Sequence, residues 1–279
     1  MYFCTMFSGK AHIILLVFIV LTGFSSCSGY DKLLKSTDYN LQYEKAMEYY
    51  ENEQYVRATG LFDKVINVFR GTTKADTVFY YQARCYFMQR DYTLAGYHFK
   101  NLATNYPNST YTEEANFLTA YCFYMLSAKP SLDQENTMKA ITAFQLFVIK
   151  YPRSERRGTA EEYIVELRDK IVEKSYMSGT LYYNLGEYKA SIIALQNSLQ
   201  EFPETRHREE LIFLLLKSNY LLAVNSVPER QVERYQDTVN QYYSFVGEFP
   251  DSPYRREADR MYREALDRTG GVDLLSGQE

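Results

Sequence analysis

The sequence predicts an all-α fold, a right-handed superhelical solenoid of five helix-turn-helix repeats. Three observations support this prediction. One helical pattern recurs five times at constant internal spacing, a small residue occupies the same place in every copy, and a proline closes four of the five copies. Repeats of this kind bury a continuous core between neighbours, so we expect one quasi-one-dimensional domain over residues 41–268.

The recurring pattern, which we call the frame, predicts the second helix of each repeat. Its copies begin at Tyr55, Tyr92, Thr137, Tyr188 and Tyr235. The small residue three positions on is Ala58, Ala95, Ala140, Ser191 or Thr238. The large apolar residue seven positions on is Phe62, Phe99, Phe144, Leu195 or Tyr242. The aromatic residue fourteen positions on is Phe69, Tyr106, Tyr151, Phe202 or Phe249. These steps fall on one face of a helix.

A proline after the last aromatic residue predicts where each second helix ends, because proline cannot continue a helix. The four prolines are Pro107, Pro152, Pro203 and Pro250. The Ser or Thr two residues later, in the segments YPNS, YPRS, FPET and FPDS, is expected to cap the next helix.

A first helix is predicted before each frame, with a small residue nine positions before the frame in three copies: Ala46, Ala83 and Gly179. Paired helices of this design resemble the tetratricopeptide repeat, whose period is about 34 residues. The frames here are 37, 45, 51 and 47 residues apart. We expect the excess in longer turns, with insertions at SAKPSLDQENT and AVNSVPERQ. The expected repeats are 41–75, 76–112, 113–158, 159–207 and 208–268, followed by a tail, 269–279.

Residues 1–26 are predicted to be a lipoprotein signal peptide. Lys10 precedes the twelve-residue apolar run 13–24, which has the length of a signal-peptide core and is short for a membrane span. Small residues then lead to Cys27, the expected lipidation site, and residues 27–40 are expected to be a lipidated tether. Acyl chains on this cysteine would hold the protein on a membrane. The alternatives are a secreted protein with a stray thiol and an uncleaved anchor.

The composition disfavours an enzyme, a metal protein and a nucleic-acid-binding protein. Lys and Arg total 31 against 35 Asp and Glu, and the net charge is −4. Three His and four Cys leave little material for a metal site, and no P-loop, HExxH or GxSxG motif is present. We therefore expect no catalytic, cofactor-binding or metal-binding residues. Cys85 and Cys122 occupy equivalent positions in neighbouring repeats, where they are expected to be buried and too far apart for a disulfide.

Seven residues are candidates for partner contacts. First-helix tyrosines are chosen because first helices usually line the concave side of a solenoid. Basic residues recur just after the frame prolines, where they could meet an acidic partner or form the ordinary surface of turns. The candidates are Tyr43, Tyr50, Tyr80, Arg206, Arg208, Arg255 and Arg256.

A family resemblance rests on the order of these features. Cys27 followed closely by YDKLLKSTDYNLQYEKAMEYYENEQYVRATGLFDKV, and then by repeats with YP.S endings, resembles the BamD family, the lipoproteins of the outer-membrane β-barrel assembly machinery. The segment CSGYDKLLKSTDYNLQYEKA is similar to the Bacteroidetes-type version. The segment LLLKSNYLLAVNSVPERQVERYQDTVNQYYSFVGEFPDSPYRREAD resembles the final repeat of the family.

The resemblance implies a non-enzymatic assembly factor, lipid-anchored at the periplasmic face of the outer membrane. Family members bind the periplasmic domains of the barrel protein BamA through their C-terminal repeats. Their N-terminal repeats are associated with unfolded outer-membrane β-barrel substrates, whose C-terminal strand ends in an aromatic residue. The Tyr-rich first repeats and the basic C-terminal turns of this chain are the corresponding candidates.

Two other functions stay open. The chain could be a repeat lipoprotein that scaffolds another cell-envelope complex, for cell-wall synthesis or division. A glycan-binding lipoprotein of the SusD type is a weaker alternative, because such proteins are normally much longer and their aromatic platforms often include Trp, which this chain lacks.

Overall fold

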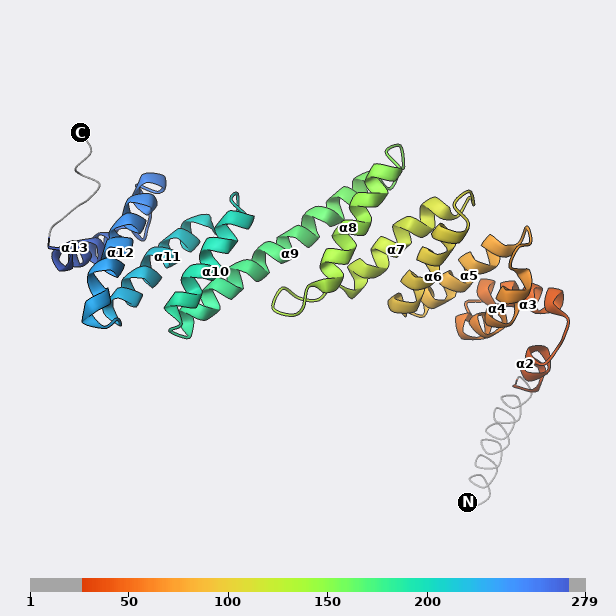
Figure 1. Cartoon of the computed structure of the whole chain (residues 1–279). Helices are drawn as coiled ribbons and strands as arrows, with labels where there is room; N and C mark the ends of the chain where they lie inside the picture. Colours follow the sequence, from red (N-terminus) through yellow and green to blue (C-terminus); the bar gives the residue numbers. More distant parts are fainter. Residues whose placement is uncertain (1–26, 271–279) are drawn as a thin grey trace, which may run out of the picture. The chain divides into compact units, whose positions relative to one another are not determined.

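The computed structural model describes residues 27–270, with side chains from residue 29 onward, and this part of the chain contains only helices and connecting turns (Figure 1). The helices are α2 Cys27–Leu34, α3 Tyr39–Glu51, α4 Tyr55–Phe69, α5 Ala75–Met88, α6 Tyr92–Asn105, α7 Thr112–Leu126, α8 Glu135–Lys150, α9 Arg157–Asn184, α10 Tyr188–Glu201, α11 Arg208–Val224, α12 Pro228–Glu248 and α13 Arg255–Arg268. The predicted all-α class is confirmed. Within residues 27–270, no helix is both long and apolar enough to cross a membrane. The predicted signal peptide lies outside the described residues.

The frames lie in the second helices α4, α6, α8, α10 and α12. Their five small residues are completely buried: Ala58, Ala95, Ala140, Ser191 and Thr238. Four of the five large residues seven positions on from the frame starts are also completely buried, and the fifth, Tyr242, is 8% exposed. The spacing therefore identified the buried face of each second helix correctly.

The chain divides into two compact units, which are described separately. Unit 1 comprises residues 27–127 and 136–164, and unit 2 comprises residues 128–135 and 165–270. In unit 1, consecutive helices from α3 to α7 pack against one another. The rings of Phe117 on α7 and Tyr163 on α9 lie 5.7 and 5.3 Å from the ring of Phe144 on α8, which joins these three helices.

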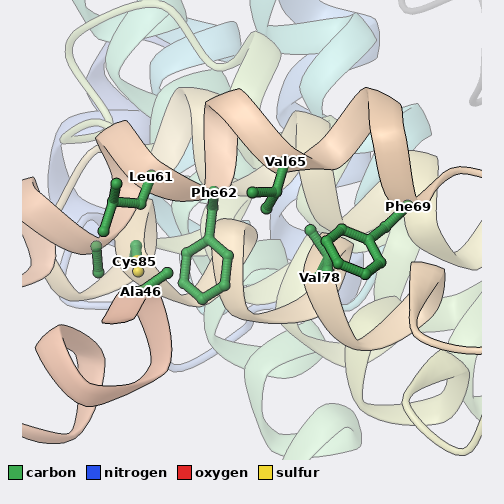
Figure 2. Packing of buried hydrophobic residues seen from close by; sticks show 8 residues of the cluster. Ala46, Leu61, Phe62, Val65, Phe69, Val78 and Cys85 are labelled. Carbon is green, nitrogen blue, oxygen red and sulfur yellow. The ribbon is translucent and has the colours of Figure 1, made fainter. Parts of the chain in front are cut away.

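The core of the first repeat shows how neighbouring helices share one apolar cluster (Figure 2). The cluster draws on α3, α4 and α5, and its buried members are Ala46, Ala58, Leu61, Phe62, Val65, Phe69, Val78 and Cys85. Half-buried tyrosines pack against it, and the hydroxyl groups of two of them, Tyr30 and Tyr50, form hydrogen bonds.

In unit 2, helices α10 to α13 pack in sequence, and α11 also contacts α13. The C-terminal part of α9 approaches α10 closely at Gly179, where a Cβ atom would lie 2.6 Å from Cδ2 of Leu195. The hydroxyl of Ser191 donates a hydrogen bond to the carbonyl oxygen of Gly179 at 3.2 Å. Small residues at this crossing thus allow the two helix backbones to come together.

The excess repeat length lies partly in helices, which corrects the expectation of longer turns. Residues 127–134 do form a loop between α7 and α8. The segment AVNSVPERQ is mostly helical, however, because α11 continues to Val224 and α12 already begins at Pro228. Proline suits this first helical position, since its missing N–H would have no helical partner there. The remaining excess is in α9, which has 28 residues against 14 in α10.

The Ser or Thr after each frame proline closes a turn, so the prediction that it caps the next helix is wrong. Its side-chain oxygen accepts a hydrogen bond from the backbone N–H two residues later, as in turns stabilised by Ser and Thr. The residues are Ser109, Ser154, Thr205 and Ser252. The capping position lies two residues further on, and at three of these helices no side-chain cap is made there.

Candidate functional site

The expected lipidation site, Cys27, is the first residue of α2, and its side chain is outside the described part of the chain. Three residues later, the Tyr30 hydroxyl donates a hydrogen bond to the carbonyl oxygen of Arg57 on α4, at 2.9 Å. Residues 27–40, expected as a tether, therefore contain a helix that contacts the first repeat.

Aromatic side chains from successive first helices form a continuous row in unit 1. The ring centres of Tyr50 on α3 and Tyr81 on α5 are 4.9 Å apart. Tyr81 also contacts the ring of its neighbour Tyr80 at 5.3 Å, and Tyr80 stacks on Tyr111, before α7, at 4.2 Å. Two of the predicted tyrosines, Tyr50 and Tyr80, are thus joined through Tyr81, which the sequence analysis did not select.

The three predicted tyrosines differ in accessibility. Tyr43 and Tyr50 are half-buried and keep part of each ring at the surface. The ammonium group of Lys74 lies 5.0 Å from the centre of the Tyr43 ring, and Nε of Arg84 donates a hydrogen bond to the Tyr50 oxygen at 3.2 Å. Tyr80, in contrast, is only 8% exposed.

Tyr80 fastens one first helix to the next. Its hydroxyl donates a hydrogen bond to Oε2 of Glu114 on α7 at 2.8 Å. Burial, together with this bond to a carboxylate, raises the pKa of the Tyr80 phenol well above its usual value. The Glu114 carboxylate also pairs with Arg156 at 3.3 Å. The position of Tyr80 is therefore that of a structural residue, and Tyr43, Tyr50 and Tyr81 remain as the accessible aromatic candidates.

The same tyrosine–glutamate bond recurs in unit 2. Tyr176 on α9 donates to Glu210 on α11 at 2.9 Å, and Tyr220 on α11 donates to Glu264 on α13 at 2.8 Å. Tyr176 and Glu210 are separated by 34 residues, as Tyr80 and Glu114 are. A search for Tyr and Glu one repeat apart in first helices would have found these pairs in the sequence.

Three arginines that begin first helices also have a structural role. In each, Nη1 donates to the carbonyl oxygen of the frame proline five residues earlier: Arg157 to Pro152, Arg208 to Pro203 and Arg255 to Pro250, at 3.0–3.3 Å. Each guanidinium also pairs with a carboxylate, from Glu161, Glu248 or Asp259. The candidates Arg208 and Arg255 are thus held by intramolecular bonds at the start of α11 and α13.

The other two basic candidates are more exposed. The side chain of Arg206 is 63% exposed, and its guanidinium lies 3.4 Å from the carboxylate of Glu173. His207 contacts the same carboxylate at 3.0 Å and stacks on Tyr176 at 4.1 Å. Arg256 is exposed on the first turn of α13.

The exposed face of α13 is more basic than the sequence analysis proposed. Arg256, Arg260 and Arg263 are spaced by four and three residues, so they share one helix face, and all three are exposed. Arg260 lies 3.8 Å from Glu257, and Arg263 donates to a backbone carbonyl of its own helix. We call these three residues the basic stripe. Unit 2 contains the basic stripe, and unit 1 contains the aromatic row.

Two exposed apolar stripes were also missed. On α8, Met138, Leu146 and Ile149 are between 52% and 76% exposed, and at the end of α9, Leu181 and the next-turn residue Leu185, just past the helix, are 55% and 65% exposed. These positions are spaced like a buried helix face, so the sequence pattern alone could not separate them from the core.

Among the described residues, no group of three or more His, Cys, Asp and Glu side chains is placed to hold a metal ion. Cys85 and Cys122 are buried free thiols, and burial raises the pKa of each to about 12. A buried neutral thiol of this kind packs as a small apolar side chain.

Comparison with known proteins identifies the class of protein as an outer membrane lipoprotein. A family model described as YfiO, outer membrane lipoprotein, matches residues 36–233, and the chain belongs to this family. A curated protein of Aquifex aeolicus (strain VF5), named provisionally as outer membrane protein assembly factor BamD, is 27% identical over 201 residues, 71% of this chain and 65% of that protein. A Rickettsia prowazekii (strain Madrid E) protein named outer membrane protein assembly factor BamD is 21% identical over 222 residues, 79% and 84% of the two chains.

The chain spans less than two thirds of the Aquifex relative, at 65%. Among solved structures, a TPR repeats protein from Bacteroides fragilis NCTC 9343 is 12% identical, with a TM-score of 0.37 over 83% of this chain and 99% of that one. The complex of the TPR2AB domain of yeast Sti1 with pHSP90 has a TM-score of 0.36 and 12% identity, over 81% and 98%. The family expected from the sequence is confirmed as an outer membrane lipoprotein family, and the Bacteroidetes-type subgroup stays a prediction.

Proposed function

We propose that the chain is a non-enzymatic periplasmic scaffold of the β-barrel assembly machinery, which binds a BamA-like barrel protein and unfolded outer-membrane protein substrates. The observation that carries the proposal is the family match over residues 36–233, together with the assembly-factor names of the relatives it resembles. Scaffold function needs surfaces and no catalytic group, and the accessible surfaces described above are aromatic, basic and apolar.

The accessible tyrosines of unit 1, Tyr43, Tyr50 and Tyr81, are the proposed contact for unfolded substrates. An extended strand presents alternate side chains to one face, and an aromatic end residue needs ring surfaces on which to pack. Tyr43 and Tyr50 are half-buried, so each offers part of a ring that is already fixed by its neighbours. Rings fixed in advance lose little entropy when a peptide binds.

The basic stripe of unit 2 is the proposed contact for the BamA-like partner. Its three arginines lie on the exposed face of the last described helix, α13. A positively charged surface is complementary to an acidic patch on the partner, and this attraction would speed association and fix the orientation of the two proteins. Arg255 stabilises the helix that carries the basic stripe, because it bonds to Pro250 before α13 and to Asp259 within it.

Membrane attachment is proposed to occur through acylation of Cys27. Several acyl chains on one residue give stable anchoring, since each buried CH₂ contributes about 0.8 kcal/mol. Fractionation of cells that produce Cys27→Ala tests this step: the variant should leave the outer-membrane fraction, and mass spectrometry of the mature N terminus should show no acyl chains. An unmodified Cys27 in the wild-type protein would remove the anchor from the proposal.

Depletion of the chain in its own host tests the assembly function. Outer-membrane β-barrel proteins should fall in abundance, with unfolded forms accumulating in the periplasm, while other lipoproteins keep their levels. Normal barrel levels accompanied by defects in cell-wall synthesis or division would instead favour a scaffold for another envelope complex.

A further inference from the structure

Helix α2 packs against the first repeat through the side chain of Tyr30. Gly60 on α4 provides the space, because a Cβ atom at that position would lie 2.5 Å from the Tyr30 hydroxyl oxygen. That hydroxyl bonds to the Arg57 carbonyl at 2.9 Å, and the Tyr49 ring meets the Tyr30 ring edge-on at 5.7 Å. The Arg57 guanidinium lies 5.8 Å from the centre of the same ring. Tyr30 is thus half-buried and contacts both α3 and α4.

A second contact fixes the link between α2 and α3. Gln42 is 1% exposed, and its Nε2 donates to the carbonyl oxygens of Leu33 at 2.8 Å and Ser36 at 3.1 Å. Leu33 and Leu34 pack against the apolar cluster of the first repeat. The whole segment from Tyr30 to Ser36 is therefore held by the folded repeat.

This docking leaves almost no free tether after the proposed anchor. Cys27 precedes Tyr30 by three residues in the same helix, which corresponds to about 4.5 Å along the helix axis. Even if those residues became fully extended, they would span only about 10 Å. Acyl chains on Cys27 would consequently keep the first repeat at the lipid surface.

We propose that α2 is a rigid membrane-docking element that holds the start of α3 against the phospholipid surface. The proposal rests on the acylation of Cys27 put forward above. Tyr39 and Leu41, on the first turn of α3, are 41% and 40% exposed and supply side chains suited to the interface. A tyrosine places its ring among lipid chains and its hydroxyl among headgroups, while an exposed leucine gains by entering the apolar layer.

The absence of Trp from the sequence permits a direct test. The acylated full-length Tyr39→Trp variant would be reconstituted into phosphatidylethanolamine and phosphatidylglycerol vesicles, with or without brominated phosphatidylcholine, which quenches indole fluorescence on contact. We expect brominated lipid to cause a loss of Trp emission. Two further changes in this background, Tyr30→Ala or a flexible Gly/Ser insertion between Ser28 and Gly29, should restore the emission while acylation persists.

The outcomes separate the two proposals. Acylated Tyr39→Trp protein that shows no quenching, or quenching that survives the Gly/Ser insertion, would overturn the docking proposal and leave the lipid anchor intact. An unmodified Cys27 would overturn both. Because the insertion leaves every docked residue unchanged, its result stands even if Tyr30→Ala misfolds.

Discussion

The hydroxyl oxygen of Tyr80 lies 2.8 Å from Oε2 of Glu114, which follows it by 34 residues and belongs to the next first helix. Tyr176 and Glu210 repeat this relationship at 2.9 Å in unit 2. The apolar frame sets which faces of the helices pack within and between repeats. The tyrosine–glutamate bond adds a directional constraint between neighbouring first helices.

Replacing Tyr80 by Phe should lower the free energy of unfolding by about 1–2 kcal/mol, because a buried bond to a carboxylate is lost while the ring remains. Urea denaturation followed by circular dichroism measures the change. Tyr97→Phe is the matched control, since the Tyr97 side chain is 61% exposed and the loss of its hydroxyl should cost little. Equal stability of the two variants would show that the Tyr80–Glu114 bond contributes nothing.

The tyrosine–glutamate bonds predict a loss of stability at alkaline pH. Burial and the bond to glutamate raise the pKa of Tyr176 and of Tyr220 from 10.0 to about 12. Above pH 10 the unfolded chain releases phenol protons that the folded chain still keeps, so the free energy of unfolding falls as pH rises toward the folded pKa. Below pH 10 this contribution is fully present.

Denaturation over a series of pH values checks the sign of this linkage. The double variant Tyr176→Phe, Tyr220→Phe should lose stability less steeply above pH 10 than the wild type does. An identical slope in both proteins would mean that these two phenols titrate alike in the folded and unfolded states.

Gly179→Ala should destabilise unit 2 by about 1–3 kcal/mol, because its Cβ would lie 2.6 Å from Cδ2 of the fully buried Leu195. Gly247→Ala is the matched control: it is also helical and has nothing within 4 Å, so it should stabilise by about 0.5–1 kcal/mol through its better helix propensity. Thermal unfolding of the two variants measures both effects. The same sign in both would contradict the close approach of α9 to α10.

Charge reversal separates binding from stability at α13. The triple variant Arg256→Glu, Arg260→Glu, Arg263→Glu should weaken association with the BamA-like partner and leave the folded helix content unchanged, since all three side chains are exposed. Arg255→Glu should instead lower stability, because Arg255 bonds to Pro250 and Asp259. Affinity pull-down together with circular dichroism distinguishes these effects. Undiminished binding by the triple variant would remove the basic stripe from the proposed interface.

Much of the fold could be predicted from the sequence because close-packed helices accept only certain side-chain sizes at their crossings. Ala58 and Ser191 are buried where the frame places small residues, and Phe62 is buried where it places large ones. The length of α9 was also predictable in principle. The segment 157–184 contains no proline, so nothing of that kind interrupts the helix, whereas the excess length had been expected in turns.

The candidate site was less predictable because it depends on which side of a helix each residue occupies. Tyr80 and Tyr81 are neighbours, yet Tyr80 points into the structure and Tyr81 is half-buried at its edge. Arg255 and Arg256 differ in the same way, since only Arg255 reaches back to the frame proline. Successive residues are about 100° apart around a helix. An error of one position in a predicted helix face therefore confuses a buried structural residue with a surface residue.

Co-purification from detergent-solubilised outer membranes tests the central claim most directly. A C-terminal affinity tag on the full chain, with the tagged Arg256→Glu, Arg260→Glu, Arg263→Glu variant beside it, allows partners to be identified by quantitative mass spectrometry. The proposed scaffold function predicts that a BamA-like barrel protein is recovered in stoichiometric amounts with the wild type and depleted with the variant. Recovery of cell-wall or division proteins, with no BamA-like protein in the wild-type sample, would contradict it.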